Sequence, residues 1–315
     1  ADADSAERRK ALVDFALPKN IAGLEKDLMQ YRIKYDRWFK ESTLHNDGSV
    51  TEVIEKLKAL GVTYEQDGAL WFKASEYGND KDIVLIRANG LPTYIVPDIA
   101  YHYNKLVTRG NDIAVDVLGA DHHGYVPRMK AALTALGIDA GRLNCVIMQM
   151  VRLVRDGETI KLSKRSGKAI TLTTLLEEVP IDAARFFFNL REPNSHFDFD
   201  LDLAAQETSQ NPVYYVQYAH ARICSILKKA ESNGVSIRKA TDEELNLLNA
   251  PEELELIRHL SALTDEIITA AKVYDPAKIT HYVITLATLF HKFYNAQRVM
   301  CEDEGLMQAR LNLCI

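Results

Sequence analysis

Cysteine is scarce in this sequence of 315 residues, and the four that occur do not stand at metal-binding spacings. No two of them form a Cys-x-x-Cys pair, and no zinc-finger pattern is present. A disulfide framework or a structural zinc site is therefore not indicated, and reduced thiols are the simplest interpretation. We expect no protein-bound metal. The cysteines are Cys145, Cys224, Cys301 and Cys314.

Long apolar runs are also missing. None approaches the roughly eighteen residues needed to span a bilayer, and the first ten residues, ADADSAERRK, are too polar for a signal peptide. The composition, 47% hydrophobic and 26% charged, predicts a globular chain long enough for two domains. We therefore expect a cytoplasmic protein with no membrane partner.

What the sequence does contain is a lysine-rich segment, KLSKRSG, at 161–167. Lys161 and Lys164 can direct their charges at phosphate oxygens, where each charged hydrogen bond contributes about 1.5–3 kcal/mol. So short a cluster is more often solvated surface, and the motif alone does not establish a phosphate site.

The residues around this segment make the region strongly basic. The sequence VRLVRDGE at 151–158 predicts a strand followed by a tight turn. Residues 151–168 include six basic and two acidic side chains, a local net charge of +4 in a chain of formal net charge −6. Such a region attracts the phosphates of ATP or of a nucleic acid.

Together these segments, MVRLVRDGE followed by KLSK, resemble the second class I signature of arginyl-tRNA synthetases. That family usually has Met where Leu162 stands and Ser where Arg165 stands. The resemblance implies that Lys161 and Lys164 are catalytic and stabilise the charge on the leaving pyrophosphate. It also implies that Ser163 and Lys164 bind ATP, which Mg²⁺ accompanies.

Four further blocks resemble bacterial members of the same family, in the family's order. The resemblance implies ATP-dependent activation of L-arginine and its transfer to tRNA(Arg). The blocks are YEQDGALW at 64–71, PTYIVPDIAYH at 92–102, GADHHGY at 119–125 and NPVYYVQYAHAR at 211–222.

The family's other signature, His-x-Gly-His, is absent, since none of the nine histidines shows that spacing. The chain starts at Ala1 without Met and ends at Ile315 within an apolar periodic run. We therefore expect a fragment of a monomeric parent, without the N-terminal domain and the His-x-Gly-His half, that is inactive alone. A non-catalytic tRNA-binding or structural fragment stays open. An unrelated adenylyl-forming enzyme is a further alternative, but the helical sequence beyond residue 205 counts against it.

The periodicity predicts a small α+β insert, a parallel α/β sheet and, from about residue 202, an all-helical region. The resemblance implies that these are parts of an α/β Rossmann-like domain with a partial parallel sheet, a small α+β insertion and an all-α helical bundle. The domains that it implies are a connective insertion at 1–80, the second half of the class I catalytic domain at 81–204, and an anticodon-binding domain truncated at its C-terminus at 205–315. A parallel sheet cut in half exposes apolar strand faces, so we expect exposed apolar surface near residues 83–118 and 145–150, or self-association.

A candidate arginine pocket lies in the first of these regions. We expect Tyr94 at the end of a strand over 94–96 and Asp98 at the start of a helix, so that both lie at the carboxyl edge of the sheet. A carboxylate there can accept a guanidinium in a bidentate pair. An ordinary helix N-cap is the alternative for Asp98. The resemblance implies that both residues contact the arginine side chain.

The segment GADHHG at 119–124 follows an apolar strand and precedes a helix, as ligand-binding loops often do. Two adjacent histidines point in different directions and have no evident third ligand, so metal binding is not expected. The resemblance implies that His122 faces the arginine pocket and that Gly119 and Asp121 border the ribose of ATP.

The helix predicted from Asn211 and Pro212 carries tyrosines beside a basic residue. Tyr215, Tyr218 and Arg222 are candidate tRNA contacts, because aromatic rings stack on bases and arginine binds phosphate. Core packing of a bundle helix explains the tyrosines equally well.

Overall fold

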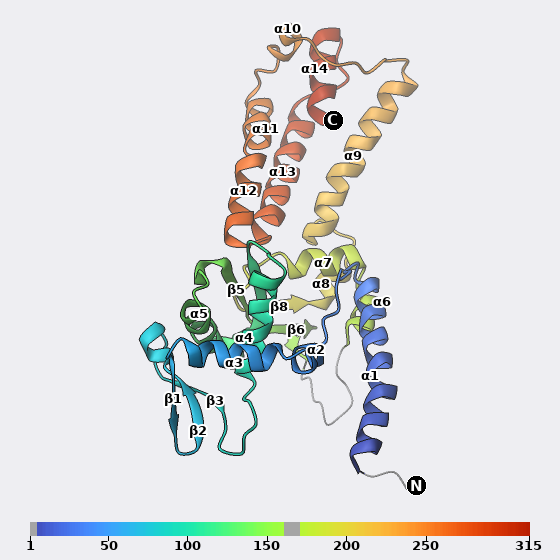
Figure 1. Ribbon diagram of the computed structural model, residues 1–315. Coiled ribbons are helices and arrows are strands. Elements are labelled where there is room, and N and C mark those ends of the chain that lie inside the picture. The colour runs from blue at the N-terminus through green and yellow to red at the C-terminus, as the bar shows by residue number, and fades with distance from the viewer. Residues whose placement is uncertain (1–4, 161–170) are drawn as a thin grey trace. The chain divides into compact units, whose positions relative to one another are not determined.

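The structure is a computed structural model that describes residues 5–160 and 171–315 (Figure 1). Its chain forms two compact units. Unit 1 comprises Ala1–Lys34, Val151–Glu192 and Phe197–Ile315, and unit 2 comprises Tyr35–Met150 and Pro193–His196. Within the described ranges, no helix is both long enough and apolar enough to cross a membrane.

Unit 2 begins with helices and an antiparallel sheet of order β1-β2-β3. Asp67 and Gly68 have φ of 52° and 73°, and these left-handed conformations close the tight hairpin between β1 and β2. The sequence predicts both this hairpin, from the Asp-Gly pair between two strand-like runs, and a helix from Ser49 that Gly61 stops, and the structure confirms both. The elements are α2 (Ser42–Asn46), α3 (Ser49–Ala59), β1 (Thr63–Gln66), β2 (Ala69–Phe72) and β3 (Ile83–Ile86).

Helix α4 (Ile95–Tyr103) corrects the strand predicted over 94–96. Tyr94 is the N-cap residue of this helix, and Asp98 lies in its first turn. Pro97 is compatible with a helix this close to its start, where its missing N–H has no helical partner to lose. Burial of the apolar residues Ile95, Val96 and Ile99 against the core then outweighs their preference for strands.

A parallel pair of strands, β4 and β5, completes unit 2. Helix α5 (Tyr125–Ala135) connects β4 (Ala114–Gly119) to β5 (Leu143–Met148), which is the expected strand–helix–strand pattern. The expected apolar exposure is present on β4, where Val117 is 63% exposed and Val115 is also exposed.

Unit 1 contains a small sheet in which β6 pairs with β8 in parallel and with β7 antiparallel. Asp156 and Gly157, with φ of 51° and 76°, form the tight turn predicted from the sequence. The elements are α1 (Ser5–Gln30), β6 (Val151–Arg155), β7 (Glu158–Thr159), α6 (Leu172–Glu178), α7 (Ile181–Phe188), β8 (Phe197–Asp200) and α8 (Leu201–Ala205).

The remainder of unit 1 is helical, and α13 packs against α9, α11 and α12 (Figure 1). Asn211 caps α9 by accepting a hydrogen bond from the N–H of Val213 at 3.0 Å, as the sequence predicted. The apolar periodicity predicts a helix over about 252–273, and the structure divides this segment at Ala262 into two helices. The helices are α9 (Pro212–Ser232), α10 (Asp242–Leu245), α11 (Pro251–Ser261), α12 (Leu263–Val273), α13 (Ala277–Ala296) and α14 (Glu304–Cys314).

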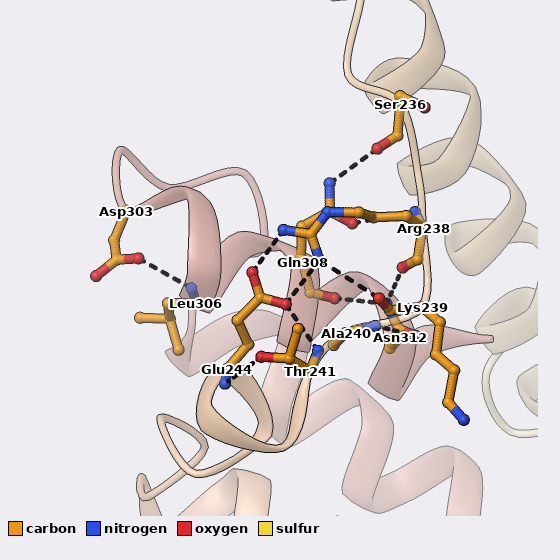
Figure 2. Close-up of polar contacts among 10 residues, drawn as sticks. All are labelled: Ser236, Arg238, Lys239, Ala240, Thr241, Glu244, Asp303, Leu306, Gln308 and Asn312. Atoms are coloured by element: carbon orange, nitrogen blue, oxygen red, sulfur yellow. Dashed lines mark hydrogen bonds and ion pairs between the residues drawn. The ribbon is translucent and has the colours of Figure 1, made fainter.

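The segment between α9 and α10 is fastened to α14 by side-chain amides (Figure 2). Gln308 donates to the carbonyl of Ser236 at 2.8 Å, and Asn312 donates to the carbonyl of Arg238 at 2.7 Å. Arg238 also forms a two-bond ion pair with Glu244. The hydrogen bonds from Arg238, and to a smaller extent the one from the backbone N–H of Thr241, lower the pKa of Glu244 to about 2.

A buried ion pair joins α14 to α11. Arg310 Nε lies 2.7 Å from Glu253 Oε1, and the two side chains are 9% and 1% exposed. The same guanidinium donates to the carbonyl of Arg298 and to Gln297 Oε1. It therefore fixes the segment that follows α13 as well as the α11–α14 contact.

We predict that Glu253→Gln lowers the stability of unit 1 by about 3–5 kcal/mol, because Arg310 is left charged and buried without a counter-charge. Denaturant-dependent hydrogen exchange of the amides in α11 and α14 measures the change. Glu255→Gln is the matched control: its carboxylate is exposed and 4.0 Å from Lys292, and it should cost about 0–1 kcal/mol. Equal effects of the two substitutions would refute the role of the buried pair.

Candidate functional site

The lysine segment predicted to bind phosphate, with Lys161, Ser163 and Lys164, lies outside the described residues. The other predicted contacts lie among the described residues of units 2 and 1.

The start of α4 presents Tyr94 at the surface of unit 2. This side chain is 64% exposed, and its hydroxyl accepts a hydrogen bond from Arg128 Nη1 of α5 at 3.0 Å. The phenol is thus held in place from the neighbouring helix while its ring stays accessible to a ligand.

Asp98, one turn further along α4, is a partly buried carboxylate without an ion pair among the described residues. Burial raises the pKa of Asp98, and so do the negative charges of Glu41 and Asp116, while His102 and Lys105 act in the opposite direction. A partly buried carboxylate without an ion pair favours the binding of a cationic ligand.

Tyr125 connects Asp98 with the loop after β4. Burial, then the negative charge of Asp98 and a hydrogen bond to it, raise the pKa of Tyr125. The ring of His122 meets the ring of Tyr125 edge-on at a centroid distance of 6.4 Å. The structure therefore gathers Asp98 and His122 around Tyr125. Tyr94 is hydrogen-bonded to Arg128, which lies on the same helix as Tyr125.

Sequence reasoning missed Tyr125 and Arg128 as members of this cluster. A signal was present, because both follow the GADHHG segment at the start of a helix and are three residues apart, so they share a helix face.

Gly119 ends β4, and a single helical turn, Ala120–His122, follows it. A Cβ at Gly119 would lie 2.7 Å from Asp121 Oδ1, so a side chain at this position would require the Asp121 carboxylate to move. The carboxylate of Asp121 is itself strongly exposed and available to a polar ligand.

Behind Asp98 lies a network of charged side chains between α4 and β4. His102 Nε2 is 2.6 Å from Asp116 Oδ2, and Lys105 Nζ is 2.8 Å from Asp116 Oδ1. Burial alone would raise the pKa of Asp116, but the hydrogen bonds and charges of His102 and Lys105 lower it to about 2. Asp116 is therefore ionised at neutral pH.

In unit 1, Arg222 of α9 lies between two tyrosine rings. Its guanidinium is 4.6 Å from the ring centre of Tyr218 and 4.8 Å from that of Tyr294 on α13. It also donates to the Tyr218 hydroxyl at 3.1 Å. Tyr218 is 44% exposed, whereas Tyr215 packs against the helical core and contacts the ring of His291.

Two adjoining hollows of about 340 and 770 Å³ lie beside this cluster and share Ile226, Lys229 and Tyr294. The smaller is lined by Arg222 and Tyr218, and the larger extends to Arg298, Asn233 and Gln297. Aromatic faces, cations and amides in one groove suit a single-stranded nucleic acid.

No cluster of three or more His, Cys, Asp or Glu side chains suited to a metal occurs in the described parts of either unit. Asp121 and His122 are 3.8 Å apart, and that pair alone does not make a metal site.

Two protein-family models match the chain. The model described as the catalytic domain of class I tRNA synthetases (R) matches residues 2–225, and the DALR anticodon binding domain matches residues 216–315. The parallel strands belong to the first match and the bundle to the second.

Curated relatives extend the similarity over the whole chain. The arginine–tRNA ligase of Caldanaerobacter subterraneus is 54% identical over 314 residues, which are 100% of this chain and 56% of the relative. That of Ruminiclostridium cellulolyticum is 53% identical over 98% of this chain and 55% of the relative. The chain thus spans little more than half the length of these relatives.

Solved structures agree in fold. A crystal structure described as an arginyl-tRNA synthetase from Campylobacter jejuni superposes with a TM-score of 0.86 and 35% identity, over 98% of this chain and 67% of that one. Arginyl-tRNA synthetase of Thermus thermophilus gives a TM-score of 0.83 at 22% identity, over 97% and 61%.

The raised pKa of Asp98 yields a stability prediction. The pKa of Asp98 in the folded state lies above the usual 3.8, so the charged carboxylate destabilises the folded state. The free energy of unfolding therefore falls as pH rises from 3.8 through the folded-state pKa, and below pH 3.8 the destabilisation is absent. We predict that Asp98→Asn stabilises unit 2 at pH 7 and that the gain shrinks as pH falls toward 4. Tryptophan fluorescence during urea unfolding measures this, since Trp38 and Trp71 both lie in unit 2.

Asp82→Asn is the control of opposite sign. Two hydrogen bonds from Ser75 and one from Tyr64 stabilise the Asp82 carboxylate and lower its pKa, so its stabilising effect is present above pH 3.8. This substitution should destabilise unit 2 at pH 7. Destabilisation by both substitutions would contradict the assignment of Asp98 as an uncompensated charge.

Proposed function

The chain belongs to the class I arginyl-tRNA synthetase family, and we propose on this basis that it serves ATP-dependent charging of tRNA(Arg) with L-arginine. The observation that carries the proposal is Asp98: a partly buried carboxylate, without an ion pair among the described residues, beside an accessible tyrosine. Arginine supplies the missing positive charge.

Recognition of arginine is assigned to three residues of unit 2. Asp98 accepts the guanidinium, because a carboxylate and a guanidinium match in shape and charge. Tyr94 offers its ring or hydroxyl, and His122 borders the same pocket. Tyr125 supports this assignment, since its contacts reach both Asp98 and His122.

Binding of ATP is assigned to the loop after β4 and to the lysine segment. The small residue Gly119 lets the backbone approach the nucleotide, and Asp121 accepts from the ribose hydroxyls. Ser163 and Lys164 contact the phosphates. Lys161 and Lys164 stabilise the charge that develops on pyrophosphate, which is catalysis by positioning and electrostatics. Mg²⁺ accompanies ATP.

Contact with tRNA is assigned to the groove between α9 and α13. Tyr218 stacks on a base, and Arg222, already oriented by two rings, binds phosphate or a base. Tyr215 belongs to the same assignment as the residue beneath them, because it packs on the core under this surface.

The remaining proposals concern organisation and location. Residues 1–80 form a connective insertion, 81–204 the second catalytic half and 205–315 the anticodon-binding domain. The full-length protein is a cytoplasmic monomer, and the 315-residue chain self-associates through the exposed apolar face of β4.

A second candidate is a non-catalytic role as a tRNA-binding or structural part of such a synthetase. The absence of His-x-Gly-His and the coverage of only 56% of the first relative favour it for the chain alone. Arginine-dependent ATP–pyrophosphate exchange with tRNA(Arg) separates the two candidates: exchange by residues 1–315 alone would exclude the non-catalytic one.

In a protein that joins this chain to the remaining length of its relatives, we predict that Lys164→Ala slows this exchange about 100-fold with little change in arginine KM. Asp98→Asn should do the reverse and strongly raise the arginine KM, because an amide cannot balance the guanidinium charge. Steady-state exchange kinetics measure both. The roles are wrong if Lys164→Ala raises only the arginine KM.

For RNA binding, Arg222→Ala in the 315-residue chain should weaken tRNA(Arg) about tenfold and reduce the salt dependence of log Kd by about one unit. Arg258→Ala is the control, since Arg258 is an exposed cation of α11 that lines neither hollow. Filter-binding titrations at several salt concentrations measure both variants. Equal losses in the two would show that only general surface charge is involved.

A further inference from the structure

The charged network of unit 2 ties the helix that carries Asp98 to the strand that leads into the Gly119 loop. His102 Nδ1 lies 2.7 Å from the backbone carbonyl of Asp98, and His102 Nε2 lies 2.6 Å from Asp116. Asp116 stands on β4, three residues before Gly119. One imidazole therefore links the two segments assigned to arginine and ATP.

Hydrogen-bond chemistry defines the state of this ring. A carbonyl and an ionised carboxylate have no hydrogen to give, so both contacts of His102 need a hydrogen on the imidazole. The 2.6 Å distance to Asp116 is typical of a charge-assisted bond, whereas the 3.3 Å distance to Lys105 Nζ is not. Both ring nitrogens of His102 therefore face oxygen acceptors in this arrangement.

Lys105 adds a positive charge to this network. Among the described residues, Asp116 is the only anion that Lys105 or His102 contacts directly. Lys105 also lies 4.7 Å above the ring centre of Tyr101, which fixes its side chain beside α4. His102 and Lys105 oppose the effect of burial on the Asp98 carboxylate, whereas Asp116 adds to it.

Packing alone does not account for such a cluster. Apolar side chains of similar volume would avoid the cost of desolvating an ion pair and an imidazole, and replacement of buried ion pairs by apolar residues is often neutral or stabilising. The cluster does what apolar residues cannot, because it fixes the Asp98 carbonyl and supplies a positive field.

We propose that His102, Lys105 and Asp116 are positioning residues of the arginine site. The contacts of His102 with the Asp98 carbonyl and with Asp116 hold Asp98 in register with the Gly119 loop, and Lys105, fixed by Asp116, supplies a positive charge that favours the Asp98 carboxylate. The inference rests on the proposed assignment of Asp98 to arginine. None of the three side chains contacts the substrate in this account, and each acts through Asp98.

The test is a titration of the 315-residue chain with L-arginine, in which binding is monitored by the amide chemical shifts of Asp98 and Gly119. Lys105→Met removes this positive charge and should weaken arginine binding about tenfold, a loss of about 1.4 kcal/mol. Lys105→Arg keeps the charge and the contact to Asp116, and should restore most of the affinity. Asp82→Asn, an equally conservative change in the same unit, should leave the arginine affinity unchanged even if it lowers stability.

The outcomes separate the two proposals. If the wild-type chain binds no arginine, both the arginine site and this inference fail. If it binds arginine and Lys105→Met binds equally well, or Lys105→Arg is as weak as Lys105→Met, only this inference fails. An independent readout is the ¹⁵N spectrum of His102 at pH 7, identified by its loss in His102→Gln. Two attached hydrogens are expected, and a ring with a single hydrogen would overturn the network.

Discussion

The account of this chain depends on the electrostatic condition of one carboxylate. Asp98 is withdrawn from water and forms no ion pair within the described residues, yet His102 and Lys105 oppose its neutralisation. The folded protein thus retains a negative charge that would be more stable in solvent. Sites that bind a cation selectively need such a charge, because the ligand then supplies what the protein lacks.

In both units, the side chains proposed to bind a ligand are held in place by neighbouring side chains. In unit 2, α4 and α5 hold Asp98 and Tyr94 through Tyr125 and Arg128. In unit 1, Tyr218 and Tyr294 hold Arg222 between their rings before any RNA is present. Both arrangements hold these side chains in place before a ligand binds, which reduces the side-chain conformational entropy that is lost on binding.

Much of the fold followed from local sequence signals, and the failures have physical causes. The Asn211 cap and the Asp67-Gly68 and Asp156-Gly157 turns depend on neighbouring residues, so the sequence predicted them. The strand expected at 94–96 was wrong because burial of Ile95 and Val96 on a helix face outweighs β-propensity. The contact of His102 with Asp116 joins residues 14 positions apart on different elements, and no periodicity in the sequence predicts such a contact.

The most direct test of the account is the pKa of the Asp98 carboxyl, measured by ¹³C NMR with and without L-arginine. The account predicts a pKa above the usual 3.8 in the free chain and a fall when arginine binds. Citrulline, which resembles arginine but lacks its positive charge, should leave the pKa unchanged. An ordinary pKa that does not respond to arginine would contradict the assignment of Asp98 as the residue that selects the substrate.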